Sequence, residues 1–160
     1  METIQFTILI NANKQKVWNT MLEDKTYRQW TTAFHEGSFY KGSWETGSEI
    51  HFLGPAEDGK LGGMYSKIKE NRKHEYISIE HLGMVKDGVI DTTSDEVRKW
   101  TPAFENYTFT EKARLNDPVG QGNQTENIPA YYGAGFASEY KAMFEEMWPR
   151  ALKTLKDLCE

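Results

Sequence analysis

The chain has 160 residues and carries 24 Asp and Glu against 19 Lys and Arg, a formal net charge of −5 at pH 7. This length fits one domain with one core, so we expect a single domain over residues 1–160, and the mild acidity disfavours a general attraction to nucleic acid. No apolar stretch approaches the roughly 20 residues that span a bilayer, and the N-terminus shows no basic segment followed by an apolar run, so we expect a cytoplasmic protein without membrane insertion.

The expected core is aromatic. Hydrophobic residues make up only 38% of the chain, but 5 Trp, 8 Tyr and 8 Phe are present. Aromatic side chains bury a large area each, so a core can form despite the low hydrophobic fraction. The one cysteine, Cys159, excludes an internal disulfide.

The N-terminal part predicts a strand followed by two short helices. Residues 3–10 alternate between apolar and polar side chains, which is typical of a strand with one buried face. Asn13 can cap a helix over about 14–22, where apolar residues recur at helical spacing. Asp24 can begin a second short helix that ends near Trp30.

The middle of the chain is dominated by strand and turn signals. Apolar and β-branched residues alternate between turns rich in Gly, Asp, Asn and Pro. The polar segment 86–101 predicts a loop with an extended piece around Val89–Ile90. Strands are expected over 38–41, 48–53, 63–70, 74–84 and 104–115, with a hairpin turn over 116–122 and a weaker strand over 123–130.

The C-terminal part predicts one amphipathic helix of about 24 residues. Apolar side chains recur at every third or fourth position, and charged side chains fill the other face. The apolar positions are Phe136, Tyr140, Met143, Phe144, Met147, Ala151, Leu152, Leu155 and Leu158.

This order of elements predicts an α+β fold. Consecutive strands joined by short turns pair antiparallel, and a long amphipathic helix is the natural cover for the concave face of a curved sheet. If side chains do not fill the concavity, an apolar cavity remains between the helix and the sheet. Such cavities are the usual place for small ligands.

Several short motifs in this order resemble the START-like (SRPBCC, birch-pollen-allergen-like) superfamily, and within it the homologues of the C-terminal domain of the heat-shock ATPase activator. The resemblance implies a helix-grip fold, with about six to seven strands and two short helices after the first strand, wrapped around a long C-terminal helix. It implies no shared catalytic residues, since such proteins include lipid carriers, cyclases, hormone receptors and co-chaperones. The motifs are Ile10-Asn11-Ala12, Lys16-Val17-Trp18, Tyr27-Arg28-Gln29-Trp30-Thr31, Trp44-Glu45-Thr46-Gly47-Ser48, Gly88-Val89 with Asp91, Glu105-Asn106-Tyr107 and the run from Trp148 to Lys156.

The candidate cavity-lining residues combine apolar side chains with a few polar ones. His81 shares a strand face with Ile79, and Glu105 shares one with Tyr107. A buried carboxylate or imidazole there could anchor a ligand or act as an acid or base, although each also fits a purely structural role. The full set is His81, Glu105, Tyr107, Phe109, Ile79, Met143, Met147, Tyr140 and Trp44.

Other chemistries find no support in the sequence. No two of the four histidines have metal-ligand spacing, although His35 could lie at a cavity mouth. No serine lies in a G-x-S-x-G elbow, and no glycine pattern indicates a phosphate or dinucleotide loop. We therefore predict no catalytic residue, no metal and no cofactor.

Three functions remain open at this point. The first is a non-catalytic protein that binds a small apolar or amphipathic molecule between the C-terminal helix and the sheet. The second is a co-chaperone-like domain with a protein partner. The third is a cyclase- or hydrolase-type enzyme in which two of His81, Glu105 and Tyr107 converge in the cavity. The sequence leaves the oligomeric state undecided.

Overall fold

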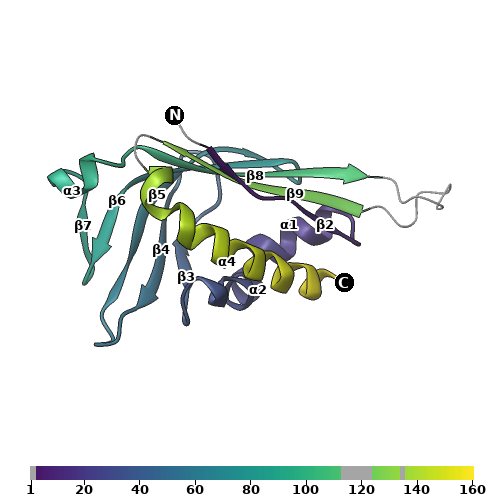
Figure 1. Cartoon of the computed structure of the whole chain (residues 1–160), viewed down its shortest axis with the longest axis horizontal. Helices are drawn as coiled ribbons and strands as arrows, with labels where there is room; N and C mark the ends of the chain where they lie inside the picture. The colour runs from purple at the N-terminus through teal and green to yellow at the C-terminus, as the bar shows by residue number, and fades with distance from the viewer. Residues whose placement is uncertain (1–2, 113–123, 134–135) are drawn as a thin grey trace.

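The chain folds into a curved antiparallel sheet with a long C-terminal helix lying across it (Figure 1). The computed structural model describes residues 3–112, 124–133 and 136–160, with the backbone alone for 132–133 and 136–140. The predicted α+β class, with a curved antiparallel sheet and a long C-terminal helix, is confirmed. The expected turn over 116–122 lies outside the described residues.

The sheet of the described residues has nine strands in the order β1-β9-β8-β6-β5-β4-β3, with β2 also paired to β9 and β7 to β6. This exceeds the expected six to seven because the N-terminal strand is divided in two and the extended piece near Val89–Ile90 forms a strand of its own. The strands are β1 (Thr3–Gln5), β2 (Ile8–Ile10), β3 (Phe39–Gly42), β4 (Glu49–Pro55), β5 (Leu61–Arg72), β6 (Tyr76–Lys86), β7 (Val89–Asp91), β8 (Ala103–Lys112) and β9 (Gln124–Gly133).

The division between β1 and β2 has a local cause. Both strands pair with β9 in one continuous register, Gln5 opposite Ala130 and Ile8 opposite Asn127. Between them, the Phe6 amide donates to the Pro129 carbonyl at 2.9 Å. Proline has no N–H to return a second bond, so the ladder is interrupted there.

Two short helices follow β2, as predicted, and pack under the sheet. Helix α1 (Lys14–Leu22) begins after Asn13, whose Oδ1 accepts a hydrogen bond from the Lys16 amide at 2.8 Å. Helix α2 (Asp24–Trp30) continues into the 3₁₀ turn η1 (Thr31–Ala33). A further short helix, α3 (Asp95–Arg98), occupies part of the segment predicted to be a loop.

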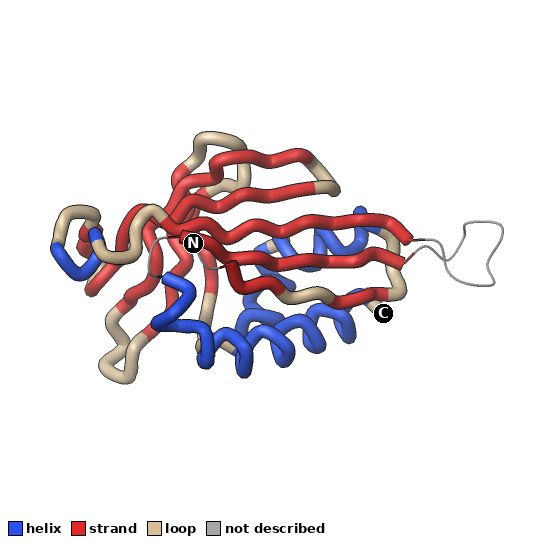
Figure 2. The backbone as a smooth tube through the Cα atoms, turned by 45° about the horizontal axis from the view of Figure 1, so that its top comes forward, coloured by secondary structure: helices blue, strands red, loops and turns tan. Residues whose placement is uncertain are grey.

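Helix α4 (Phe136–Cys159) runs beneath the strands and places one face against them (Figure 2). Its buried residues include Phe144, Trp148, Leu152 and Leu155. Trp148 is the centre of an aromatic cluster, with ring centroids 4.8 Å from Phe34, 5.8 Å from Tyr131 and 5.9 Å from both Trp30 and Phe6. The aromatic residues thus supply much of the core, as their abundance predicted.

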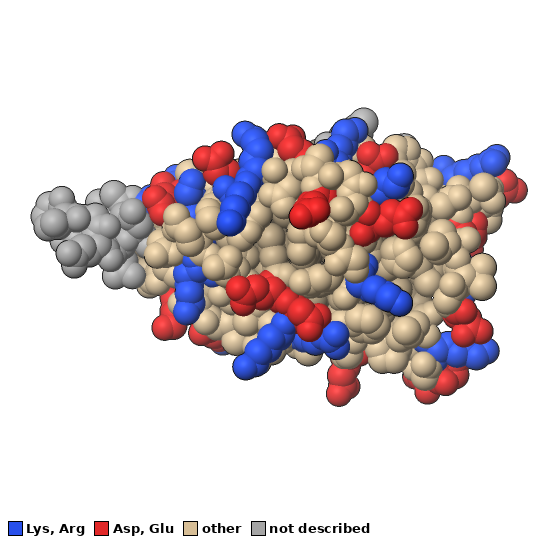
Figure 3. All heavy atoms as spheres, turned by 180° about the vertical axis from the view of Figure 1, so that it is seen from behind, with Lys and Arg blue, Asp and Glu red and all other residues tan. Residues whose placement is uncertain are grey.

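Charges of both signs are interspersed over the back of the molecule, and neither sign gathers into one broad patch there (Figure 3). Such a surface offers no extended basic track for a phosphate backbone. Within the residues that the structure describes, no helix combines the length and apolar character needed to cross a membrane.

Candidate ligand-binding cavity

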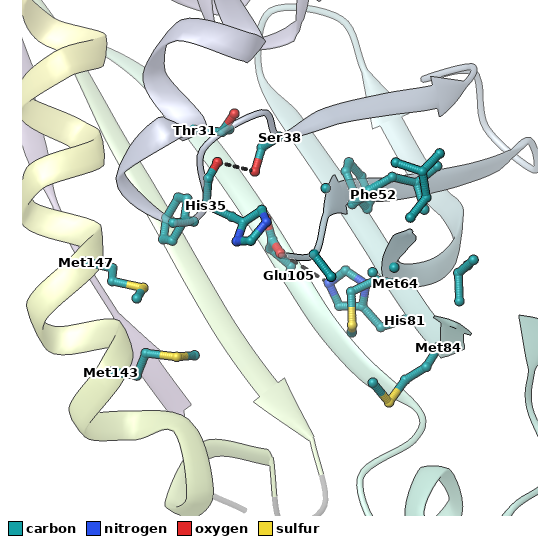
Figure 4. Close-up of a pocket in the computed structure, with 18 of the residues that line it drawn as sticks. Thr31, His35, Ser38, Phe52, Met64, His81, Met84, Glu105, Met143 and Met147 are labelled. Carbon is teal, nitrogen blue, oxygen red and sulfur yellow. Dashed lines mark hydrogen bonds and ion pairs between the residues drawn. The ribbon is translucent and has the colours of Figure 1, made fainter. Parts of the chain in front are cut away.

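A cavity of about 740 Å³ lies between the first half of α4 and the strands that face it (Figure 4). Its volume is in the range of pockets that hold drug-sized molecules. In the close-up, Met143 and Met147 reach in from α4 towards Met64 and His81 on the opposite wall. The apolar part of the wall includes Trp30, Phe34, Phe52, Met64, Met84, Trp100, Met143, Phe144, Met147 and Trp148.

The polar part of the wall is centred on the carboxylate of Glu105. Glu105 lies on β8 and faces Ile79 of β6 and Tyr131 of β9 in the sheet register. The His81 Nε2 lies 3.1 Å from Glu105 Oε1, and the His81 Nδ1 lies 2.7 Å from the Ser66 hydroxyl on β5. An ionised carboxylate can only accept, so Nε2–H donates to Glu105, and in a neutral ring Nδ1 accepts from Ser66.

Two tyrosines complete the contacts of this carboxylate. The Tyr107 hydroxyl donates to Glu105 Oε2, and the Tyr131 hydroxyl also hydrogen-bonds the Glu105 carboxylate. Donors from β6, β8 and β9 therefore converge on one side chain that is 13% exposed. We call Ser66, His81, Glu105, Tyr107 and Tyr131 the Glu105 cluster.

The cavity keeps its buried tyrosines protonated. Burial is the main cause that raises the pKa of Tyr131 well above its ordinary value, and the negative charge of Glu105 raises it further. The pKa of Tyr27 is raised in the same way, first by burial and then by Glu105 and Tyr40. The buried Trp148 Nε1–H faces the Tyr131 hydroxyl and partly offsets its shift, but the contact is looser than a hydrogen bond.

The mouth of the cavity is formed by the loop after η1 and by the β4–β5 and β6–β7 turns. His35 lines it, with Nε2 2.5 Å from the Pro55 carbonyl oxygen, and the Ser38 hydroxyl donates to the His35 carbonyl at 2.8 Å. A Cβ at Gly54 would lie 2.5 Å from His35 Cδ2, so only glycine leaves room for this ring. Lys60 pairs with Asp87 across the two turns at 3.6 Å.

Five of the residues predicted from the sequence lie on the cavity wall: His81, Glu105, Tyr107, Met143 and Met147. The first three converge in the Glu105 cluster, and the two methionines face them from α4. That these residues contact a ligand stays a prediction.

The other predicted residues do not join this wall in the described structure. Phe109 packs on Trp18 of α1, with ring centroids 5.1 Å apart, because α1 covers that part of β8. Ile79 is fully buried in the core, and Trp44 is half-buried with its Nε1 donating to the Leu22 carbonyl at 3.1 Å. The side chain of Tyr140 lies outside the described residues.

Sequence reasoning missed Tyr131 and Ser66. The strand predicted from the sequence ends at residue 130, whereas β9 continues to Gly133 and places Tyr131 opposite Glu105. Ser66 reaches His81 because β5 and β6 pair these two residues. Both contacts depend on cross-strand register, for which the sequence carries no local signal.

The described residues contain no group of three or more His, Cys, Asp or Glu side chains placed to hold a metal ion. His81 and Glu105 are the polar pair of the cavity interior, and both already have protein partners. The arrangement can therefore offer hydrogen bonds to an apolar molecule that carries one or two polar groups.

The fold and the cavity define a class of α+β proteins in which a curved sheet and a long C-terminal helix enclose an apolar space. No family model matches the chain, and no curated protein matches it in sequence. Solved structures of the same fold do match it, at sequence identities that show the fold alone.

Three of these structures cover nearly the whole chain. The Aha1 dimer from Colwellia psychrerythraea aligns with a TM-score of 0.67 at 16% identity, over 100% of this chain and 97% of that one. MLL2253 from Mesorhizobium loti aligns with a TM-score of 0.65 at 13% identity, over 98% of this chain and 96% of that one. CalU16 from Micromonospora echinospora aligns with a TM-score of 0.60 at 13% identity, over 99% of this chain and 76% of that one.

Proposed function

We propose that the protein binds a small apolar or amphipathic molecule in the cavity between α4 and the sheet, without changing it chemically. The observation that carries the proposal is the 740 Å³ cavity with a mainly apolar wall. An empty apolar space of this size costs stability, because the side chains around it lose their packing partners. A ligand would restore those contacts.

The contacts of the polar groups support binding over catalysis. Both His81 nitrogens have partners, Ser66 and Glu105, and both Glu105 oxygens accept hydrogen bonds. A general base has to reach a substrate proton, and here both nitrogens of His81 are already held by protein groups. We also propose that the chain belongs to the START-like superfamily, which the fold and the sequence motifs support.

Acid–base catalysis in the same cavity is the second candidate, and the convergence of His81, Glu105 and Tyr107 favours it. The two readings differ in the fate of the ligand. A binding protein releases the molecule with unchanged mass, whereas an enzyme of the cyclase or hydrolase type releases a product whose formula or retention time differs.

A co-chaperone-like role is the third candidate, and the shared fold of the Aha1 dimer is its support. An exposed apolar patch with a filled interior would favour it. The described structure instead has an interior cavity, and its large exposed apolar residues are spread over β2, β5, β7 and α4, with two of them adjacent on β7. They are Leu9, Leu61, Val89, Ile90 and Met143.

Native mass spectrometry of the purified protein, before and after denaturing extraction, tests the proposal. We expect an added mass that survives gentle ionisation and appears in the extract. Met147→Trp, which fills the cavity from α4, should lose this mass. Lys153→Trp, which adds the same ring to the exposed face of the same helix, should keep it. Equal retention by both variants would place the molecule elsewhere and contradict the proposal.

A further inference from the structure

We infer that the cavity selects its ligand by the polar head: a protonated amine donates a hydrogen bond to Glu105, and a carboxylate is rejected. This inference rests on the proposed function, because it names the chemical class of the bound molecule. The expected ligand has an apolar body and a single ammonium group that lies at the Glu105 cluster.

The first argument is the number of hydrogen bonds that Glu105 still accepts. A carboxylate offers about four lone-pair positions. His81 Nε2 takes one at 3.1 Å, and the Tyr107 and Tyr131 hydroxyls take two more. The carboxylate lies on the cavity wall and stays 13% exposed. One acceptor position of Glu105 is thus available to a donor that enters the cavity, whereas an ionised carboxylate has no hydrogen to give to an acceptor.

The second argument is the charge balance of the wall. The basic side chains that line the cavity, Lys60 and Lys86, are exposed at its mouth, where they pair with Asp87 and Glu96. Within the described wall, the interior carries the Glu105 carboxylate without a lysine or arginine beside it. In the tautomer with Nε2–H towards Glu105 and the Ser66 hydroxyl donating to Nδ1, the His81 ring adds no charge. With that tautomer, the negative charge of Glu105 has no positive charge beside it in the interior.

The same charge acts on two tyrosines that line the cavity. Beyond the effect of burial, Glu105 contributes to raising the pKa of Tyr27 on α2 and of Tyr131 on β9, because a second negative charge nearby is unfavourable. A ligand carboxylate would meet the same repulsion in a region of low dielectric, where it is only weakly screened. A ligand ammonium would instead gain attraction.

The third argument is the aromatic surface around Glu105. Tyr107, Tyr131 and Trp30 each have their ring centroid within 6.1 Å of the Trp148 ring, and all four residues line the cavity. Aromatic faces attract cations through their quadrupole, and desolvated sites strengthen the effect. A cation at Glu105 would thus be stabilised by the rings as well as by the carboxylate.

The test compares three probes with the same apolar body: decylamine, decanol and decanoic acid. Isothermal titration calorimetry at neutral pH measures their dissociation constants for the wild-type protein. We expect the amine to bind about tenfold or more tightly than the acid, with the alcohol between them, as one charge-assisted hydrogen bond predicts. Equal affinities for the amine and the acid, or tighter binding of the acid, would overturn the inference.

Glu105→Gln removes the charge and keeps the shape. The amide can still accept from the two tyrosines through its oxygen, and His81 can accept from its NH₂ after a change of tautomer. We expect the amine and the acid to bind this variant within about threefold of each other. Glu146→Gln is the matched control, because it makes the same change at a carboxylate of α4 that is 67% exposed and lies outside the cavity lining. It should keep the wild-type ratio, and an equal loss in both variants would contradict a specific role for Glu105.

The two proposals fail in different ways. If all three probes bind with one affinity and Met147→Trp abolishes their binding, the head-group inference is wrong and the binding function stands. If none of the probes binds the wild type, or if Met147→Trp leaves their binding unchanged, both proposals are contradicted.

Discussion

The two halves of the space enclosed by the sheet differ, although the same helix and the same strands border both. In the half near the C-terminus of α4, Ile10, Val17, Met21 and Leu155 are all completely buried. In the half near its N-terminus, a cavity of about 740 Å³ remains. The filled half receives side chains from α1, which contacts α4, β8 and β9. The hollow half is bordered instead by α2 and η1, whose Trp30 and Thr31 belong to its wall without filling it.

The largest loss of stability is expected when a core side chain in the filled half is shortened. Leu155→Ala removes a completely buried side chain and leaves a void. The free energy of unfolding should fall by about 2–5 kcal/mol, measured by urea denaturation. A loss below about 1 kcal/mol would show that this half is not tightly packed.

The hollow half should respond most clearly to alkaline pH. Tyr27 and Tyr131 have pKa values raised above the ordinary 10.0, chiefly by burial. Above pH 10 the unfolded chain loses their protons and the folded chain keeps them, so stability is complete below pH 10 and falls above it. The slope should approach about 1.4 kcal/mol per pH unit for each tyrosine.

The control for this slope is Tyr131→Phe, which removes one of the two groups. Urea midpoints measured from neutral to alkaline pH should fall less steeply in the variant. An unchanged slope would mean that Tyr131 titrates in the folded protein as it does in the unfolded chain. The hydroxyl also donates to Glu105, so its removal should cost about 1–3 kcal/mol at neutral pH.

Shortening a side chain on the cavity wall should cost less than the change at Leu155. Met84 lines the cavity and is half-buried, so Met84→Ala enlarges an existing space. We expect a loss of about 1 kcal/mol or less in the same urea experiment. A loss as large as that for Leu155→Ala would indicate that the two halves are packed alike.

The smallest effect is expected at Asp91, outside both halves. Its pKa is lowered, mainly by hydrogen bonding with Ser94, and its Oδ1 accepts from the Ser94 and Thr93 amides. The stability that the lowered pKa of Asp91 contributes is present above the ordinary pKa of 3.8, and it is lost as the pH falls through the lower pKa of the folded state. Asp91→Asn should flatten acid unfolding slightly when followed by circular dichroism. A steeper acid transition would contradict this role.

The sequence predicted the elements well and the site in part. Helix α4 and the alternating strands follow from local periodicity, which the sequence carries directly. The strand alternation also placed Phe109 correctly on the inward face of β8, where it is buried. The sequence could not show that α1 covers this part of β8. Likewise, Ser66 meets His81 and Tyr131 meets Glu105 only through strand register. Strand register and the placement of α1 are properties of the tertiary structure. The full membership of the Glu105 cluster therefore could be identified only from the structure.

The tryptophans in the cavity wall also provide an intrinsic fluorescence signal that responds to the contents of the cavity. Three of its five tryptophans, Trp30, Trp100 and Trp148, border the cavity. The emission wavelength of an indole depends on the polarity around it, and its intensity depends on nearby quenchers. Occupation of the cavity would therefore change the intrinsic fluorescence of the protein, and affinities and exchange rates could be followed without any attached dye.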